Sequence, residues 1–138
     1  MSKKVVVLGA NFGGLTAALS LKKDLKNDVD VTVVSDRDYF LFNPSLIWLP
    51  FGKRDESNVT FKVAPTFEKG GVHFIKSAAN EIKPELKKVD LDNGQSIDYD
   101  YLVIATGTRN KPEHVPGLFE NTSTITTLGD AENAGRQW

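Results

Sequence analysis

No cysteine occurs in this chain, and only two histidines do. These absences exclude disulfide bonds, thiolate metal ligands and cysteine nucleophiles within these residues. His73 and His114 are too few and too far apart in sequence to indicate a metal site. The acidic and basic side chains almost cancel, to a net charge of −1, so the charge gives no reason to expect binding to nucleic acid or to an anionic membrane.

Long apolar runs are also absent from the sequence. Only the apolar residues 5–8 lie between the N-terminal lysines and Gly9, which is too short for the core of a signal peptide. The longest other candidate, residues 46–51, is interrupted by Pro50 and falls far short of a membrane span. The length and the ordinary apolar content of 40% predict one globular domain over residues 1–138, located in the cytoplasm.

The sequence does contain a strand, a glycine-rich turn and a helix in immediate succession. Residues 5–14 read VVVLGANFGG, and residues 15–26 place apolar side chains at helical spacing. The apolar, β-branched start predicts a strand covered on both faces, and residues 29–34 predict a second strand. Together these elements predict a right-handed βαβ unit whose helix points its first N–H groups at a dinucleotide pyrophosphate.

The residues of the turn have separate predicted roles. Gly9 permits the sharp bend after the strand, Gly14 permits close packing of helix and strand, and Gly13 leaves the helix start uncluttered. Asn11 takes the place of the usual middle glycine, and asparagine tolerates left-handed backbone angles. The alternative interpretation is a tight turn that binds nothing. The candidate pyrophosphate-binding residues are Gly9, Ala10, Asn11, Phe12, Gly13 and Gly14.

The end of the second predicted strand is the usual place for an acidic residue that accepts hydrogen bonds from ribose hydroxyls. The strand pattern places Ser35 at that position and Asp36 directly after it. Either side chain can reach a ribose, Ser35 as donor or acceptor and Asp36 as acceptor, and the sequence does not decide between them. The alternative is a solvated surface role for both residues.

The rest of the chain predicts shorter elements. A helix is expected to start at Ala64-Pro65 and a third strand at residues 72–75. The Asn-Gly pair at 93–94 predicts a β-hairpin with a type I′ turn between residues 86–91 and 95–97.

The C-terminal part of the chain predicts one more strand and one more helix. Residues 101–105 form an apolar run, which predicts a buried strand, and it ends in Ala105-Thr106-Gly107. Asp130 is expected to cap the N-terminus of a final helix.

The order of these motifs resembles the two-dinucleotide-domain flavoproteins of the pyridine nucleotide–disulfide oxidoreductase type. The carriers of the resemblance are the strand–glycine–helix segment, the hairpin and the segment YDYLVIATG at residues 99–107. Residues 38–48, DYFLFNPSLIW, look most like sulfide:quinone oxidoreductases, and type II NADH dehydrogenases carry similar segments. The resemblance implies an α/β, Rossmann-like FAD-binding domain with three layers, in which a parallel sheet is joined by a β-hairpin or meander.

The resemblance also implies roles for individual positions. Residues 9–14 would hold the pyrophosphate of FAD, and Ser35 or Asp36 the adenosine ribose. The remaining implied contacts are Ala79 with the adenine through its backbone, and Asn43, Pro44, Ala105, Thr106 and Gly107 with the flavin. Small residues at 105–107 permit a close approach of backbone to ligand, although a plain strand end followed by a turn is the alternative there.

Flavoproteins of this type are much longer than 138 residues, so the resemblance implies a truncated, N-terminal portion of a larger enzyme. It would pass electrons from sulfide or NADH through FAD to quinone, and it would meet the membrane surface peripherally, through parts outside these residues. No catalytic residue is expected here, because the redox cysteines of the family would lie beyond residue 138. Thr126-Thr127 stands where some relatives carry Cys-Thr, and the oligomeric state is left open.

Half of a flavin site loses binding energy without losing the cost of ordering the ligand. We therefore expect weak or absent FAD binding by these residues alone. Two other functions stay open from the sequence: a type II NADH:quinone dehydrogenase, and a nucleotide-binding module without turnover.

Overall fold

The computed structural model describes residues 1–111 and 114–137. Contacts group the chain into two compact units, Met1–Phe40 with Lys62–Gly107 and Leu41–Phe61 with Thr108–Trp138. The predicted pyrophosphate and ribose segments and the Ala-Thr-Gly bend all lie in the first unit. Asn43 and Pro44 lie in the second.

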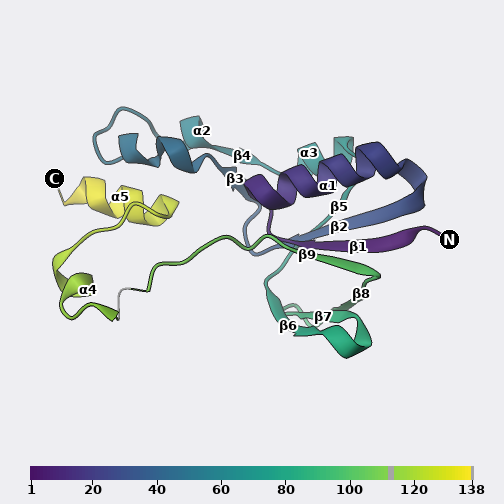
Figure 1. Ribbon diagram of the computed structural model, residues 1–138. Helices are drawn as coiled ribbons and strands as arrows, with labels where there is room; N and C mark the ends of the chain where they lie inside the picture. The colour runs from purple at the N-terminus through teal and green to yellow at the C-terminus, as the bar shows by residue number, and fades with distance from the viewer. Residues whose placement is uncertain (112–113, 138) are drawn as a thin grey trace. The chain divides into compact units, whose positions relative to one another are not determined.

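A four-stranded parallel sheet forms the centre of the first unit (Figure 1). Its strands are β1 (Lys3–Leu8), β2 (Val29–Ser35), β5 (His73–Lys76) and β9 (Tyr101–Ile104), in the order β5-β2-β1-β9. Helix α1 (Phe12–Leu25) connects β1 to β2 and completes the predicted βαβ unit. Because all four strands are parallel, their carboxyl ends meet at one edge of the sheet, where open α/β sheets bind their ligands.

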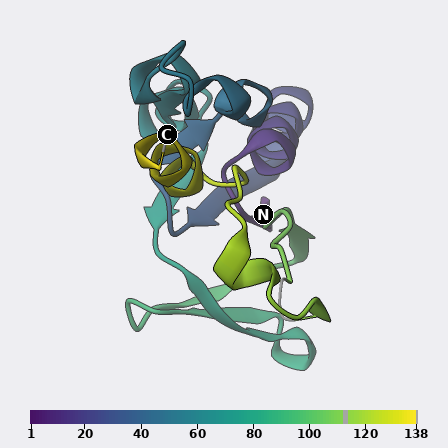
Figure 2. The same ribbon diagram turned by 90° about the vertical axis from the view of Figure 1, so that its left-hand side faces the viewer.

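Alternate residues of β1 enter two different apolar clusters, because successive side chains of a strand point to opposite faces. Val5 and Val7 pack with residues of α1 and α3 (Ala64–Lys69), and Val6 and Leu8 pack against a three-stranded meander. The meander consists of β6 (Ala79–Lys83), β7 (Lys88–Leu91) and β8 (Ser96–Asp98), paired antiparallel. It lies on the side of the sheet opposite α1 (Figures 1 and 2). The predicted three-layer α/β fold is confirmed.

The turn of the β7–β8 hairpin differs from the prediction. A type I′ turn needs positive φ at both central residues, but only Gly94 has it, at +84°. The Gly94 N–H donates to the Leu91 carbonyl at 3.0 Å, and the Leu91 N–H donates to the Gln95 carbonyl at 2.9 Å. These bonds define a three-residue loop with a left-handed glycine at its end. The Asn93 side chain accepts from the Gln95 N–H at 3.0 Å, which stabilises this loop instead.

The prediction that residues 101–105 form a buried strand is wrong in part. β9 is the edge strand of the sheet, and among the described residues it pairs only with β1. Leu102 and Val103 are half-buried, but Tyr101 is 60% exposed and Ile104 63%. An apolar run therefore does not distinguish a central strand from an edge strand here.

The second unit is built from short helices. In it, α5 (Leu128–Arg136) packs on the segment that contains η2 (Asn43–Trp48, a 3₁₀-helix), burying Leu128, Ala131 and Ala134. The remaining elements of the chain are η1 (Lys26–Asp28), β3 (Tyr39–Leu41), α2 (Glu56–Val59), β4 (Thr60–Lys62), η3 (Pro84–Leu86) and α4 (Leu118–Asn121). No helix within the described ranges is both long enough and apolar enough to cross a bilayer.

The start of α5 also corrects a prediction, because Thr127 and not Asp130 is the N-cap residue. Thr127 Oγ1 accepts from the Asp130 N–H at 3.2 Å, and Asp130 Oδ2 accepts from the Thr127 N–H at 3.0 Å. This reciprocal pair is a capping box, which the spacing Thr-x-x-Asp predicts. Gly129 and Asp130 thus lie in the first turn of a helix.

Candidate nucleotide-binding site

The glycine turn after β1 is fixed between the ends of two neighbouring strands. Gly9 has φ +104°, and its N–H donates to the carbonyl of Val34 in β2 at 2.8 Å. A Cβ atom on Gly9 would lie 2.2 Å from the carbonyl oxygen of Ala105, just after β9. Glycine is therefore required here both by the backbone angle and by the close approach of another backbone segment.

The start of α1 passes equally close to the turn that precedes it. A Cβ atom on Gly14 would lie 1.8 Å from the carbonyl oxygen of Gly9. At Gly13 the nearest such contact is ordinary, 3.5 Å from the Ala105 Cβ. The structural roles predicted for Gly9 and Gly14 are thus confirmed. A Cβ atom at Gly13 is sterically tolerated.

The N-terminus of α1 carries no side-chain cap. Asn11 is the N-cap residue, and no side-chain cap hydrogen bond is present. Its φ of −93° and ψ of −158° are extended, so its tolerance of left-handed angles is not used. The first turn contains no acidic residue, so no carboxylate there opposes the positive end of the helix dipole. Such a helix start is suited to an anion.

The Ala-Thr-Gly bend lies beside the glycine turn at the carboxyl edge of the sheet. β9 pairs with β1 in parallel, with Ile104 opposite Leu8, and the Ala105 N–H donates to the Leu8 carbonyl at 2.8 Å. Thr106 is exposed. Gly107 has φ +77°, and a Cβ atom there would meet nothing within 4 Å. The two bends singled out from the sequence are therefore brought together by the fold.

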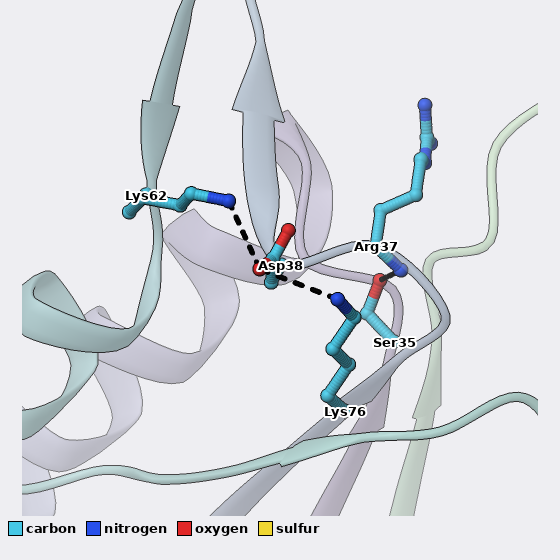
Figure 3. Close-up of polar contacts among 5 residues, drawn as sticks. All are labelled: Ser35, Arg37, Asp38, Lys62 and Lys76. Carbon is cyan, nitrogen blue, oxygen red and sulfur yellow. Dashed lines mark hydrogen bonds and ion pairs between the residues drawn. The ribbon is translucent and has the colours of Figure 1, made fainter.

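The tip of β2 shows what Ser35 and Asp36 do in the folded chain. Ser35 is buried, and its Oγ accepts from the Arg37 N–H at 3.2 Å (Figure 3). Its carbonyl accepts from the Ser77 N–H at 3.0 Å. Asp36 is exposed. The Ser35 side chain therefore organises the turn, and Asp36 remains accessible to a ligand. Ribose contact by either residue stays a prediction.

An ion cluster that is not predictable from the sequence adjoins this tip. Asp38 Oδ2 lies 3.0 Å from Lys62 Nζ and 3.3 Å from Lys76 Nζ (Figure 3). The hydrogen bond from Lys62 is the largest cause and lowers the pKa of Asp38; desolvation opposes it, and the hydrogen bond from Lys76 adds to the lowering. The two lysines come from β4 and β5, which are distant from Asp38 in the sequence, so no local sequence pattern predicts the cluster.

Arg37 was also not found from the sequence. Its guanidinium lies over the Tyr39 ring, 5.7 Å from the centroid. Within the described part of the chain, no carboxylate lies within ion-pair distance of it. The tip of β2 thus presents one guanidinium that is not neutralised by a partner.

Three other predicted contact residues belong to other elements of the fold. Ala79 opens β6, is exposed and pairs with Leu91 of the meander. Asn43 and Pro44 begin η2 in the second unit. Their implied positions beside the adenine and the flavin ring stay predictions.

Comparison with known proteins identifies the family. A family model described as pyridine nucleotide-disulphide oxidoreductase matches residues 3–138. The chain belongs to this family. The resemblance drawn from the two bends and the intervening hairpin is therefore confirmed for almost the whole chain.

Family members named as sulfide–quinone enzymes and members named as NADH–ubiquinone enzymes are both similar to this chain. Sulfide-quinone reductase of Aquifex aeolicus is 37% identical over 134 residues, 97% of this chain and 30% of that protein. External NADH-ubiquinone oxidoreductase 2 of Saccharomyces cerevisiae mitochondria is 31% identical over 140 residues, 95% of this chain and 25% of that protein. The X-ray structure of the Aquifex aeolicus sulfide:quinone oxidoreductase matches with a TM-score of 0.91 at 35% identity, over 99% of this chain and 31% of that one. The chain thus spans less than a third of the length of these relatives.

Proposed function

We propose that the first unit binds the ADP half of FAD at the carboxyl edge of its parallel sheet. The observation that carries this proposal is the glycine turn, where backbone segments approach too closely for any Cβ at Gly9 or Gly14. This packing holds the uncapped N-terminus of α1 directly beside the Ala-Thr-Gly bend. Membership of a flavoprotein-type family supports the same ligand.

The residues fit this ligand in the following proposed roles. The N–H groups at the start of α1 bind the pyrophosphate, Ser35 and Asp36 lie at the adenosine ribose, and the backbone of Ala79 meets the adenine. The segments proposed to line the flavin are Asn43-Pro44 and Ala105-Thr106-Gly107. Bound FAD would supply two-electron redox chemistry, and the residues of this chain would bind and orient it.

In the longer protein we propose a sulfide:quinone reductase-like activity, with electrons passing through FAD to quinone. The 37% identity with the Aquifex aeolicus sulfide-quinone reductase supports it. The second candidate is a type II NADH:quinone dehydrogenase, supported by the 31% identity with the yeast NADH-ubiquinone oxidoreductase. With the longer, FAD-loaded protein, bleaching of the flavin absorbance by sulfide alone supports the first candidate, and bleaching by NADH alone the second.

The nucleotide proposal is tested with a matched pair of variants at Gly13, where the fold leaves room for a Cβ atom. Gly13→Asp and Gly13→Asn have nearly the same shape, but only the aspartate places a negative charge in the first turn of α1. Because that charge repels the pyrophosphate, we expect ADP to bind about tenfold more weakly to Gly13→Asp than to Gly13→Asn. Amide chemical-shift titration with ADP at millimolar concentrations measures both affinities.

The aspartate also favours the helix dipole, so a loss of binding in Gly13→Asp is not caused by unfolding of α1. Equal affinities in the two variants would place the pyrophosphate elsewhere and overturn the proposal. The expectation that FAD binds only weakly to these 138 residues has a separate test. Flavin absorbance at close to one flavin per purified chain would contradict it.

A further inference from the structure

A link of two residues, Ser77 and Ala78, connects β5 of the parallel sheet to β6 of the meander (Figure 1). Ser77 is buried, and its N–H donates to the carbonyl of Ser35 at the tip of β2 at 3.0 Å. The link therefore lies at the carboxyl edge of the sheet, beside the tip where the adenosine ribose is proposed to bind. The direction of its backbone determines which groups the start of β6 presents to an adenine there.

The loop of the β7–β8 hairpin binds this link at two points. The Asp92 N–H donates to the Ala78 carbonyl at 3.0 Å, and the Asn93 N–H donates to Ser77 Oγ at 3.3 Å. The Ser77 hydroxyl in turn donates to the Ala78 carbonyl at 3.3 Å. Ser77 Oγ thus acts as acceptor and donor at once, and the Ala78 carbonyl accepts two hydrogen bonds.

These bonds determine the direction of the next backbone groups along the chain. In a trans peptide the N–H points opposite to the carbonyl of the preceding residue, so the Ala79 N–H points away from the hairpin loop. Leu91 lies opposite Ala79 and uses both of its backbone groups within the hairpin loop. Ala79 is therefore at a non-hydrogen-bonded position of the ladder, and its N–H and carbonyl both point to the outer edge of β6. Among the described strands, β6 is an edge strand of the meander.

The ladder between β6 and β7 does little to fix Ala79. Its register shifts between Ala79 and Glu81, which leaves Asn80 as an extra residue. A bulge of this kind interrupts the ladder and lets the strand bend. The start of β6 is therefore held by the two bonds from the hairpin loop, and the side-chain acceptor in these bonds is Ser77 Oγ.

We infer that Ser77 is a positioning residue of the nucleotide site, whose hydroxyl couples the β7–β8 loop to the backbone edge of Ala79. The inference rests on the proposed contact of Ala79 with the adenine. An N–H and a carbonyl side by side match adenine, whose N1 accepts and whose N6 amino group donates. Hypoxanthine has an N–H and a carbonyl at these two positions, so it places donor against donor and acceptor against acceptor. A firmly held Ala79 edge should therefore prefer ADP to inosine diphosphate.

Amide chemical-shift titrations of the 138-residue chain with ADP, inosine diphosphate and inorganic pyrophosphate test this inference. We expect ADP to bind about tenfold more tightly than inosine diphosphate, and Ser77→Ala to lower this ratio to about threefold or less. Pyrophosphate does not reach the adenine position, so its affinity should stay unchanged. The matched control is Ser45→Ala, which removes the hydroxyl of another buried serine, in η2 and outside the first unit, and should keep the ratio.

A second variant tests the same coupling from an exposed position. Asn93→Ala removes the side-chain acceptor for the Gln95 N–H, which loosens the hairpin loop without opening the core. We expect it to lower the ratio of the two affinities less than Ser77→Ala does. If Ser77→Ala does not fold, a lowered ratio in Asn93→Ala supports the inference, and an unchanged ratio overturns it.

The outcomes separate this inference from the proposed function. If pyrophosphate and ADP bind but inosine diphosphate binds as well as ADP, the inference falls and the nucleotide site stands. If Ser77→Ala keeps the ratio, or weakens all three ligands by the same factor, Ser77 does not position the Ala79 edge and the inference is wrong. If none of the ligands binds, the proposed function falls, and this inference falls with it.

Discussion

Two helices of this chain begin in opposite ways. The N-terminus of α5 is closed by its own side chains, because Thr127 and Asp130 exchange hydrogen bonds with each other's backbone N–H groups. The N-terminus of α1 has no side-chain cap and no acidic residue in its first turn. Capping normally contributes to helix stability, so a helix that begins without it forgoes that contribution.

The glycines in the first turns of α5 and α1 also differ, in how closely the neighbouring atoms pack around them. A Cβ atom at Gly129 of α5 would meet nothing within 4 Å, whereas one at Gly14 of α1 would lie 1.8 Å from a backbone oxygen. The start of α5 is therefore stabilised by the capping residues of the helix itself and is not packed closely against other backbone. The start of α1 is packed against neighbouring backbone with its end left uncapped, which is the arrangement that a bound pyrophosphate would complete.

The largest expected effect in this comparison comes from adding one methyl group to α1. Gly14→Ala forces its Cβ into the carbonyl of Gly9, and that oxygen cannot move without disrupting the turn between β1 and α1. We expect the free energy of unfolding to fall by about 3 kcal/mol or more. Urea denaturation followed by circular dichroism measures the change.

The matched control is the same substitution in the other helix. Gly129→Ala has free space around the new methyl group and reduces the entropy of the unfolded chain, so it should raise stability by about 0.5–1 kcal/mol. Opposite signs for the two substitutions support the comparison. Similar changes in both would show that the close approach at Gly14 relaxes readily.

A smaller effect is expected from removing the cap of α5. Thr127→Ala deletes the hydroxyl that accepts from the Asp130 N–H, and it should lower stability by about 1 kcal/mol. Thr127→Ser serves as the control, because it keeps the hydroxyl and should retain most of the stability. If the alanine and serine variants unfold at the same denaturant concentration, the capping box contributes nothing measurable to α5.

The parts of this molecule that were predictable from sequence are those determined by neighbours in the chain. Gly9 and Gly14 sit at fixed offsets from an apolar strand and a helix, so their roles followed from spacing. The loop at Asn93-Gly94 was assigned to the wrong turn type because a side-chain bond from Asn93 to the Gln95 N–H favours another geometry. Asp130 was predicted to be the N-cap residue of α5, but the N-cap residue is Thr127, and the two residues have the spacing of a capping box.

The parts that sequence did not predict depend on residues brought together by the fold. Asp38 meets Lys62 and Lys76, which come from two different strands. Nor did the apolar run of residues 101–105 reveal that its strand would lie at the edge of the sheet. Strand order is set by the packing of all layers, and an apolar pattern alone carries no information about it.

The smallest expected effect tests the comparison of the two helix starts directly, within one molecule. Inorganic pyrophosphate added to the chain should shift the amide resonances of Gly13 and Gly14, because the uncapped end of α1 favours an anion. The amide of Gly129 should not shift, because the Asp130 carboxylate already occupies the start of α5. At a concentration equal to its Kd, the anion adds only about 0.4 kcal/mol of stability, so resonance shifts are the sensitive measurement. Sodium chloride at the same ionic strength is the control for nonspecific charge effects. Equal shifts at both helices would show that the missing cap of α1 does not select for an anion, and the main physical argument for a nucleotide at this turn would be lost.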